Sequence, residues 1–247
     1  MSSSGCELSV VIPCHNEVDN LVELVARLAA AFPPGTDPAT EFILVDDGST
    51  DGSAGVLTGL ADQQSRLVPV VLPARVGQTR ALWHGLQAAR GRWIGHLDGD
   101  LQNDPADLPE MYRMARGEGL DAVLGYRLRR HDSPGRRLAS RFANGVRRLV
   151  LHDSIQDVGC STRIVRRAVL DRLPPVENQH RYLPALIELG GWRIAQVPAA
   201  HRERTRGSSK YGNLDRGLQG LRDLPRMKAY IDGLQGEALQ GALTWHR

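Results

Sequence analysis

Residues 92–105 read RWIGHLDGDLQNDP and join a short apolar run to a group of acidic and amide side chains. The apolar part, RWIGHL, is typical of a buried β-strand. Asp98 and Asp100 follow it directly, with Gly99 between them and Gln102 two residues further on. Neighbouring carboxylates repel one another unless a positive charge lies between them, so this strand end predicts a cation.

Similar apolar runs alternate with helical patterns through the first half of the chain. Further strands are predicted at 8–13, 66–72 and 120–125 and within 41–51, with helices after Asn16 and at about 52–64, 77–89 and 107–116. Asn16 is expected to cap the first of these helices. Strict alternation of strands and helices predicts an α/β fold with a mostly parallel central sheet flanked by helices.

Acids lie at the ends of two of these strands, Asp46 and Asp47 at one and Asp98 and Asp100 at the other. Ligands of open parallel sheets bind beyond the carboxyl ends of the strands, so these acids are predicted to meet in one crevice. Asp98, Asp100 and Gln102 alternate along the chain, and in an extended segment they would share one side and hold one Mg²⁺ or Mn²⁺. The alternative is an acidic turn that only caps the following helix.

The second half of the chain is less regular. Helices are predicted near 136–150, 166–172 and 180–189, strands near 158–164 and 192–197, a basic loop at 201–213 and a helical, amphipathic tail from 214 to 247. The chain contains no GxxxxGK[ST] phosphate-binding loop, and no GxGxxG follows its first strand. Ordinary mononucleotide- and dinucleotide-binding folds are therefore disfavoured.

Composition places the chain among globular proteins, with 247 residues that are 41% hydrophobic and 24% charged. Its three cysteines form no CxxC pair, which disfavours a zinc site and indicates a reducing compartment. The first residues do not resemble a signal peptide, and no run approaches the ~20 apolar residues of a membrane-spanning helix. We therefore expect a cytoplasmic location.

The net charge of +3 is unevenly distributed, because arginines crowd residues 127–148 and a second basic stretch runs from His201 to Lys228. This pattern has two possible explanations. The arginines could lie on solvated helix faces, or they could form a surface that binds phosphates, acidic lipids or nucleic acid. Aromatic residues make up only 5% of the chain, and the basic segments contain few of them. A nucleic-acid-binding module is therefore disfavoured.

In combination, the motifs resemble the family 2 glycosyltransferases, which have the Rossmann-like GT-A fold. VVIPCHNE, ILVDDGSTD, GQTRAL and HLDGDLQNDP match the family in order and spacing. In the second half, DVGCSTRIV, HRYLPALIELGG and HRERTRGSSKYG resemble the dolichol-phosphate mannosyltransferases and the undecaprenyl-phosphate sugar synthases. The resemblance implies a single catalytic domain at 1–213, with a nucleotide-sugar half at about 8–105 and an acceptor half at about 106–213.

The same resemblance implies a role for each matching residue. The nucleotide sugar would be bound by Pro13, His15, Glu17, Val45, Asp46, Asp47, Gly99 and Arg127. The metal would be held by Asp98, Asp100 and Gln102, the two aspartates also counting as catalytic together with Arg204 and Lys210. The acceptor phosphate would be bound by Arg136, Ser140, Arg204 and Lys210. His15 replaces an aromatic residue, and Gly99 replaces an alanine, an exchange that we expect to be harmless.

The implied reaction moves a sugar, with inversion, from a UDP- or GDP-linked donor to a polyprenyl phosphate, with Mg²⁺ or Mn²⁺ as cofactor. A lipid phosphate is already ionised near pH 7 and needs no general base, whereas an alcohol acceptor does. We expect peripheral binding at the inner face of the membrane, through an anionic lipid surface or a small membrane partner, and no nucleic acid. A soluble hydroxyl acceptor is the alternative.

Overall fold

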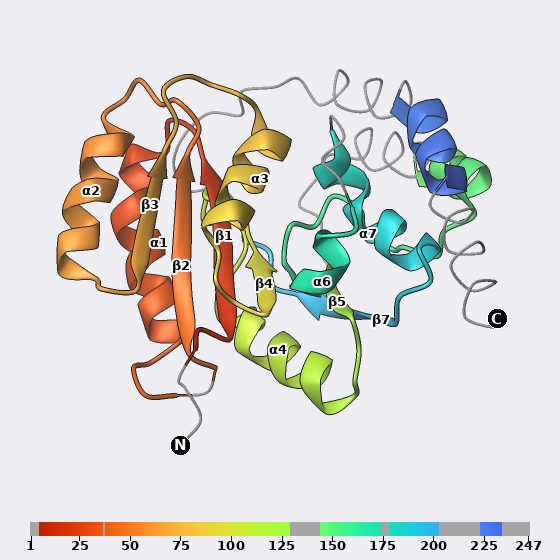
Figure 1. Cartoon of the computed structure of the whole chain (residues 1–247), viewed down its shortest axis with the longest axis horizontal. Coiled ribbons are helices and arrows are strands. Elements are labelled where there is room, and N and C mark those ends of the chain that lie inside the picture. Colours follow the sequence, from red (N-terminus) through yellow and green to blue (C-terminus); the bar gives the residue numbers. More distant parts are fainter. Residues whose placement is uncertain (1–4, 37, 129–143, 174–177, 203–222, 234–247) are drawn as a thin grey trace, which may run out of the picture.

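The computed structural model describes residues 5–36, 38–128, 144–173, 178–202 and 223–233. Its centre is a seven-stranded sheet (Figure 1). The strand order is β3 (Leu67–Val71), β2 (Thr40–Asp46), β1 (Leu8–Cys14), β4 (Trp93–His96), β6 (Arg163–Arg166), β5 (Ala122–Arg127) and β7 (Ile194–Ala199). Only β6 runs antiparallel to its neighbours, which confirms the predicted mostly parallel sheet.

Helices cover both faces of this sheet (Figure 1). One face carries α1 (Val18–Ala31), α2 (Ser53–Gln63) and α4 (Asp107–Gly117), and the other carries α3 (Gln78–Ala88), α6 (Arg167–Leu170) and α7 (Gln179–Leu189). Alternation along β1 explains the two layers, because Val10 and Ile12 pack toward α1 while Val11 packs toward α3. Each strand end therefore emerges between two helical layers.

The start of α1 differs from the prediction that Asn16 caps it. Asn16 has a left-handed backbone, with φ of 53°, and its Oδ1 accepts a hydrogen bond from the amide of Thr50 at 2.8 Å. The carboxylate of Asp51 instead accepts from the amide of Val18, the first residue of the helix, at 3.1 Å. A cap from the neighbouring loop has replaced the local one, and it joins the ends of β1 and β2.

The strand predicted at 158–164 begins only at Arg163. A turn takes its place, since the carboxylate of Asp157 accepts from the amide of Gly159 at 3.1 Å and its carbonyl accepts from the amide of Cys160 at 3.3 Å. Two further helices are predicted, one near 136–150 and one in the tail at 214–247. Residues 144–151 and 223–233 are helical, and the other residues of these two predicted helices lie outside the described ranges. None of the described helices is both long enough and apolar enough to span a membrane.

Candidate functional site

The two acidic strand ends meet above a buried cysteine. Cys14, at the end of β1, lies opposite Asp46 in the pairing of β1 with β2 and is only 2% exposed. Burial raises the pKa of the Cys14 thiol, and the carboxylates of Glu17, Asp46, Asp98 and Asp100 raise it further. The structure therefore brings the acids of both strand ends into electrostatic reach of one point, as predicted.

The loop after β2 is tied tightly to the loop after β1. Ser49 donates a hydrogen bond to Oδ1 of Asp46 and accepts one from the amide of Asn16 at 2.8 Å. His15 Nδ1 lies 2.8 Å from the carbonyl of Asp47. These contacts join the two loops that carry the predicted nucleotide-binding residues and hold them in place in the absence of a ligand.

Asp47 has a structural task. Its buried carboxylate accepts hydrogen bonds from the amides of Val76 at 2.6 Å and Gly77 at 3.0 Å, immediately before α3. Gly48 allows this approach, because it has a φ of 61° and a side chain there would come within 2.3 Å of the backbone of Ala74. Asp47 thus positions the start of α3, and its predicted contact with the nucleotide stays a prediction.

Asp98 has a partner that sequence reasoning did not assign to the site. Its Oδ1 accepts a hydrogen bond from Nε2 of Gln78, the first residue of α3, at 2.9 Å. Gln78 belongs to the GQTRAL motif, which was the available signal, but its contact with Asp98 spans 20 residues of sequence. This amide fixes the position of one carboxylate oxygen of Asp98.

The segment from Asp98 to Gln102 does not stay extended. The chain turns at Leu101, which has a φ of 61°. The carboxylate of Asp100 accepts from the amide of Gln102 at 3.2 Å, a local bond that draws the backbone back on itself. The condition under which the three side chains would share one side is therefore not met, and Gln102 as a metal ligand stays a prediction.

The turn after Asp100 is bound to the start of the basic loop. The amide of Arg202 donates to the carbonyl of Gln102 at 2.8 Å, and its guanidinium pairs with Asp104 at 2.6 Å. Asn103 forms a β-bridge with His201. The first residues of the basic loop, His201 and Arg202, therefore lie beside the turn that follows Asp100.

The chemistry of the carboxylates fits a hard divalent cation. Asp98 and Asp100 are both partly exposed and offer oxygen atoms, which Mg²⁺ and Mn²⁺ prefer. Over the described ranges, no three His, Cys, Asp or Glu side chains are grouped to hold a metal by themselves. An ion at these two aspartates would therefore take further ligands from a bound diphosphate.

Arg127 is already paired. Its guanidinium donates two hydrogen bonds to Asp157, from Nε at 2.6 Å and from an NH₂ group at 2.9 Å. This two-pronged pair clamps the end of β5 to the turn before β6. The predicted contact of Arg127 with phosphate would require this pair to open.

Two further predicted residues behave differently from expectation. Val45 is fully buried in the core under α3, so its side chain does not line the crevice, and a contact with the nucleotide would be limited to its main chain. Gly99 lies against Cys14, and an added Cβ would come within 2.7 Å of the sulfur. Glycine therefore fits at residue 99 because Cys14 occupies the space that an alanine methyl group would need, and the expectation that this exchange is harmless stays a prediction.

Two of the remaining predicted residues, Pro13 and Glu17, lie within the described part of the chain. Pro13 and Glu17 are partly buried at the crevice, and Glu17 accepts a hydrogen bond from the side chain of Asn20 at 2.6 Å. The predicted acceptor-phosphate residues Arg136, Ser140, Arg204 and Lys210 lie outside the described residues.

Comparison with known proteins gives related sequences. The chain is 38% identical over 206 residues to an undecaprenyl-phosphate 4-deoxy-4-formamido-L-arabinose transferase of Edwardsiella ictaluri, covering 83% of this chain and 63% of that protein. It is 36% identical over 210 residues to a dodecaprenyl-phosphate galacturonate synthase of Rhizobium johnstonii, covering 83% of this chain and 62% of that protein. The chain thus spans less than two thirds of the length of these relatives.

Solved structures share the fold. Glucosyl-3-phosphoglycerate synthase from Mycobacterium tuberculosis, in complex with phosphoglyceric acid, matches with a TM-score of 0.63 and 25% identity over 93% of this chain and 81% of that one. A mannosyltransferase from Pyrobaculum calidifontis, in complex with GDP-mannose and Mn²⁺, matches with a TM-score of 0.59 and 17% identity over 98% of this chain and 76% of that one. These likenesses confirm the predicted GT-A fold.

The family model described as "Glycosyl transferase family 2" matches residues 9–173, more than half of the sequence. This match begins in β1 and includes all four acids of the crevice and the turn at Asp157. The chain belongs to glycosyl transferase family 2.

Proposed function

We propose that this chain transfers a sugar, with inversion, from a nucleotide-diphosphate sugar to a polyprenyl phosphate. The observation that carries the proposal is the convergence of two acidic strand ends on Cys14, since Asp46 pairs with Cys14 between β2 and β1 and Gly99, between Asp98 and Asp100, lies against its sulfur. Arg202 begins the basic loop beside the turn after Asp100. The negative groups that would hold a metal-bound diphosphate thereby lie beside the first residues of the segment to which we assign the second phosphate. The two relatives named above carry polyprenyl-phosphate sugar transferase names, which supports the same activity.

The donor half of the proposed site lies within residues 8–105. Asp98 and Asp100 would hold Mg²⁺ or Mn²⁺, whose positive charge stabilises the diphosphate as it leaves. Gln78 holds Asp98 in place, and the Asn16–Ser49–Asp46 contacts hold the loops that would carry the nucleotide. Because these side chains are already positioned, the free-energy cost of reorganising them during the reaction is small.

The acceptor half needs positive charge more than it needs a base. A phosphate monoester is largely ionised at pH 7 and can attack the sugar without losing a proton to the protein. Arg202 is engaged with Asp104, so the cations we assign to the acceptor are Arg204 and Lys210, with Arg136 and Ser140 as further ligands. The acceptor half is proposed to extend to residue 213 and to be followed by the tail at 214–247.

Access to a lipid requires contact with a membrane. Leu128 and Leu149 are 70% and 75% exposed and lie at either end of the arginine-rich segment. We assign this segment and the tail to peripheral docking on anionic lipids at the cytoplasmic face, or on a small membrane partner. Binding to anionic liposomes that weakens as salt rises is the expected result, and absence of binding at low salt would contradict it.

A soluble phosphorylated acceptor is the second candidate. It is favoured by the likeness to glucosyl-3-phosphoglycerate synthase, which was solved with phosphoglyceric acid. The two candidates share the donor half and differ in the acceptor that the basic loop would receive.

One experiment separates them. The purified full chain is incubated with Mg²⁺ or Mn²⁺, undecaprenyl phosphate in detergent and a panel of labelled UDP- and GDP-sugars. Label in the organic phase, lost in Asp100→Asn and kept in Asp62→Asn on the exposed side of α2, is the expected result. Transfer of label only to soluble acceptors such as phosphoglyceric acid would replace the lipid proposal with the second candidate.

A further inference from the structure

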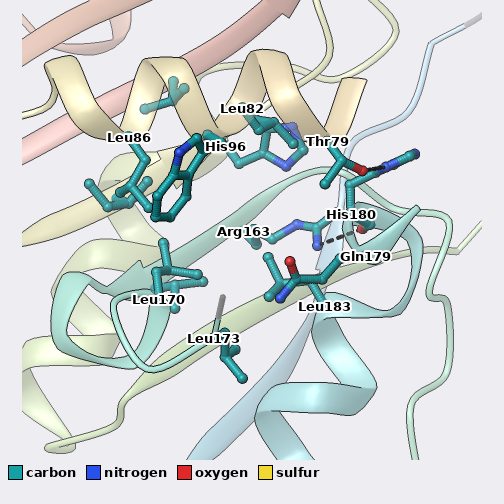
Figure 2. A pocket seen from close by; sticks show the side chains of 14 residues that line it. Thr79, Leu82, Leu86, His96, Arg163, Leu170, Leu173, Gln179, His180 and Leu183 are labelled. Carbon is teal, nitrogen blue, oxygen red and sulfur yellow. Dashed lines mark hydrogen bonds between the residues drawn. The ribbon is translucent and has the colours of Figure 1, made fainter. Parts of the chain in front are cut away.

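A cavity of about 80 Å³ lies under α3, on the face of the sheet that carries α6 and α7. Figure 2 shows Thr79, Gln179 and His180 together on one side of this cavity and Leu86 and Leu170 on the other. The surface of the cavity is therefore almost entirely apolar, with a few polar side chains gathered at one end. No role for it follows from the donor or acceptor residues described above.

The polar end lies beside the crevice. His96 is the last residue of β4, and Thr79 and Gln179 lie in the first turns of α3 and α7. Arg163 opens β6, which runs antiparallel, so it lies at the same end of the sheet and directly opposite His96. Asp98 is two residues beyond His96, which puts this end of the cavity next to the proposed metal site.

Arg163 is a buried cation held by main-chain groups. It is 3% exposed and donates to the carbonyls of Ser161 and Cys160, both at 3.2 Å, and of His180 at 3.4 Å. No carboxylate of the described chain forms an ion pair with it. Burial lowers the pKa of its guanidinium, against the attraction of Cys160, Asp98 and Asp157. Such a charge is costly unless an anion or further acceptors approach it.

His96 adds unused hydrogen-bonding capacity at the same end. It is 5% exposed, and neither ring nitrogen has a hydrogen-bond partner among the described residues. Buried polar side chains are usually satisfied, and the two ring nitrogens of His96, which have almost no exposed surface, are an exception at this end of the cavity. Thr79 and His180 close this end, with the Thr79 hydroxyl 2.7 Å from Nδ1 of His180.

The rest of the lining is apolar. Leu82, Trp83 and Leu86 project from α3, and Leu170 and Leu173 face them from α6 and the turn after it. A sugar or a nucleotide would leave its hydroxyl groups unpaired against this wall. A short branched hydrocarbon with an anionic end matches both parts.

We propose that this cavity binds the isoprene unit next to the phosphate in the polyprenyl phosphate acceptor, with the phosphate toward His96 and Arg163. The inference rests on the proposed function and deepens it, because it names the part of the acceptor that the fold itself receives. The phosphate would then face the crevice beside Asp98, where the sugar is transferred, and the rest of the chain would leave the cavity. The volume suits one such unit, not a whole lipid.

Binding is tested first on the unmodified full chain. Trp83 lines the cavity, so geranyl phosphate is expected to change tryptophan emission in a saturable way, and the change is expected to disappear in Trp83→Phe. Inorganic phosphate and geraniol serve as the two halves of the ligand, and each is expected to bind at least about 10-fold more weakly. An unchanged emission, a change that survives in Trp83→Phe, or equal affinity for inorganic phosphate would overturn the proposal.

Transfer kinetics supply the second test. Leu86→Phe fills the cavity, and it is expected to raise the KM for undecaprenyl phosphate by about 10-fold while the KM for the nucleotide sugar changes far less. Leu60→Phe is the matched control, since Leu60 lies on α2 and packs on the other face of the sheet. If both variants show the wild-type lipid KM, the inference fails while the proposed function stands. If the wild type itself makes no lipid product with any donor, the proposed function fails and takes the inference with it.

Discussion

Gln78 Nε2 donates a hydrogen bond to Asp98 Oδ1 over 2.9 Å and so joins the first turn of α3 to the acidic end of β4. Helix α3 is held in turn by Asp47, whose carboxylate binds the amides of Val76 and Gly77. The orientation of Asp98 therefore depends on a chain of contacts that begins at the end of β2.

Replacing Gln78 with alanine is expected to weaken metal use without unfolding the protein. The amide orients Asp98, and loss of a partner that orients a metal ligand typically lowers metal affinity or activity about 10- to 100-fold. The Mn²⁺ concentration for half-maximal activity should rise in a titration of sugar transfer. Gln63→Ala, at the exposed end of α2, is the matched control. An unchanged Mn²⁺ dependence would show that Asp98 needs no such support.

Replacing Asp47 with asparagine should destabilise the protein. An asparagine at residue 47 keeps one acceptor oxygen, but the charge that binds the amides of Val76 and Gly77 is lost. Hydrogen bonds to charged groups contribute about 1.5–3 kcal/mol each, so a loss of about 2 kcal/mol in the free energy of unfolding is expected. Urea unfolding measures it, and a value within error of the wild type would contradict the role assigned to Asp47.

Gly99 and Cys14 should be energetically coupled. An alanine methyl group at residue 99 would meet the Cys14 sulfur at 2.7 Å, and overpacking of this kind costs about 1–3 kcal/mol. Cys14→Ala removes the sulfur, so the double variant should recover most of the loss caused by Gly99→Ala. A double-mutant cycle from unfolding free energies measures the coupling. Strictly additive effects would mean that the backbone, and not the thiol, limits residue 99.

Glu41 should make stability depend on acid pH. Burial acts to raise the pKa of its carboxyl, but hydrogen bonds from Ser9 and from the amide and guanidinium of Arg90 outweigh it and lower the pKa. Because the folded pKa is the lower one, the contribution to stability is complete above the unfolded value, near pH 4.3–4.5, and disappears as pH falls through the folded value.

Glu41→Gln tests this dependence. It is expected to reduce the free energy of unfolding at pH 7 by about 1–3 kcal/mol and to flatten the decline below about pH 5. Urea unfolding at several pH values checks both, with Glu110→Gln as the control because the Glu110 side chain is 66% exposed. If the free energy of unfolding declines below about pH 5 in Glu41→Gln as it does in the wild type, a group other than Glu41 causes the acid sensitivity.

Much of the donor half could be predicted because its signals are local. A near-continuous apolar run such as LSVVIP specifies a strand with two buried faces, and the meeting of the acids after β2 and β4 follows from parallel strands that end at one edge. The predicted strand near 158–164 is wrong for residues 158–162, because the carboxylate of Asp157, just before them, accepts a hydrogen bond from the amide of Gly159 and forms a turn. The same kind of local bond at Asp100 bent the segment that was expected to be extended.

The sequence alone determined the order of strands and helices, the acids at the crevice and the family they indicate, because these depend on residues close together in the chain. Only the tertiary structure decided which side chains meet: Gln78 with Asp98, Arg127 with Asp157, and His96 with Arg163 at a cavity. The residues of each pair are far apart in sequence and come together when the helices pack on the sheet. The free energy of this packing depends on contacts between segments, so it cannot be read from any one of them.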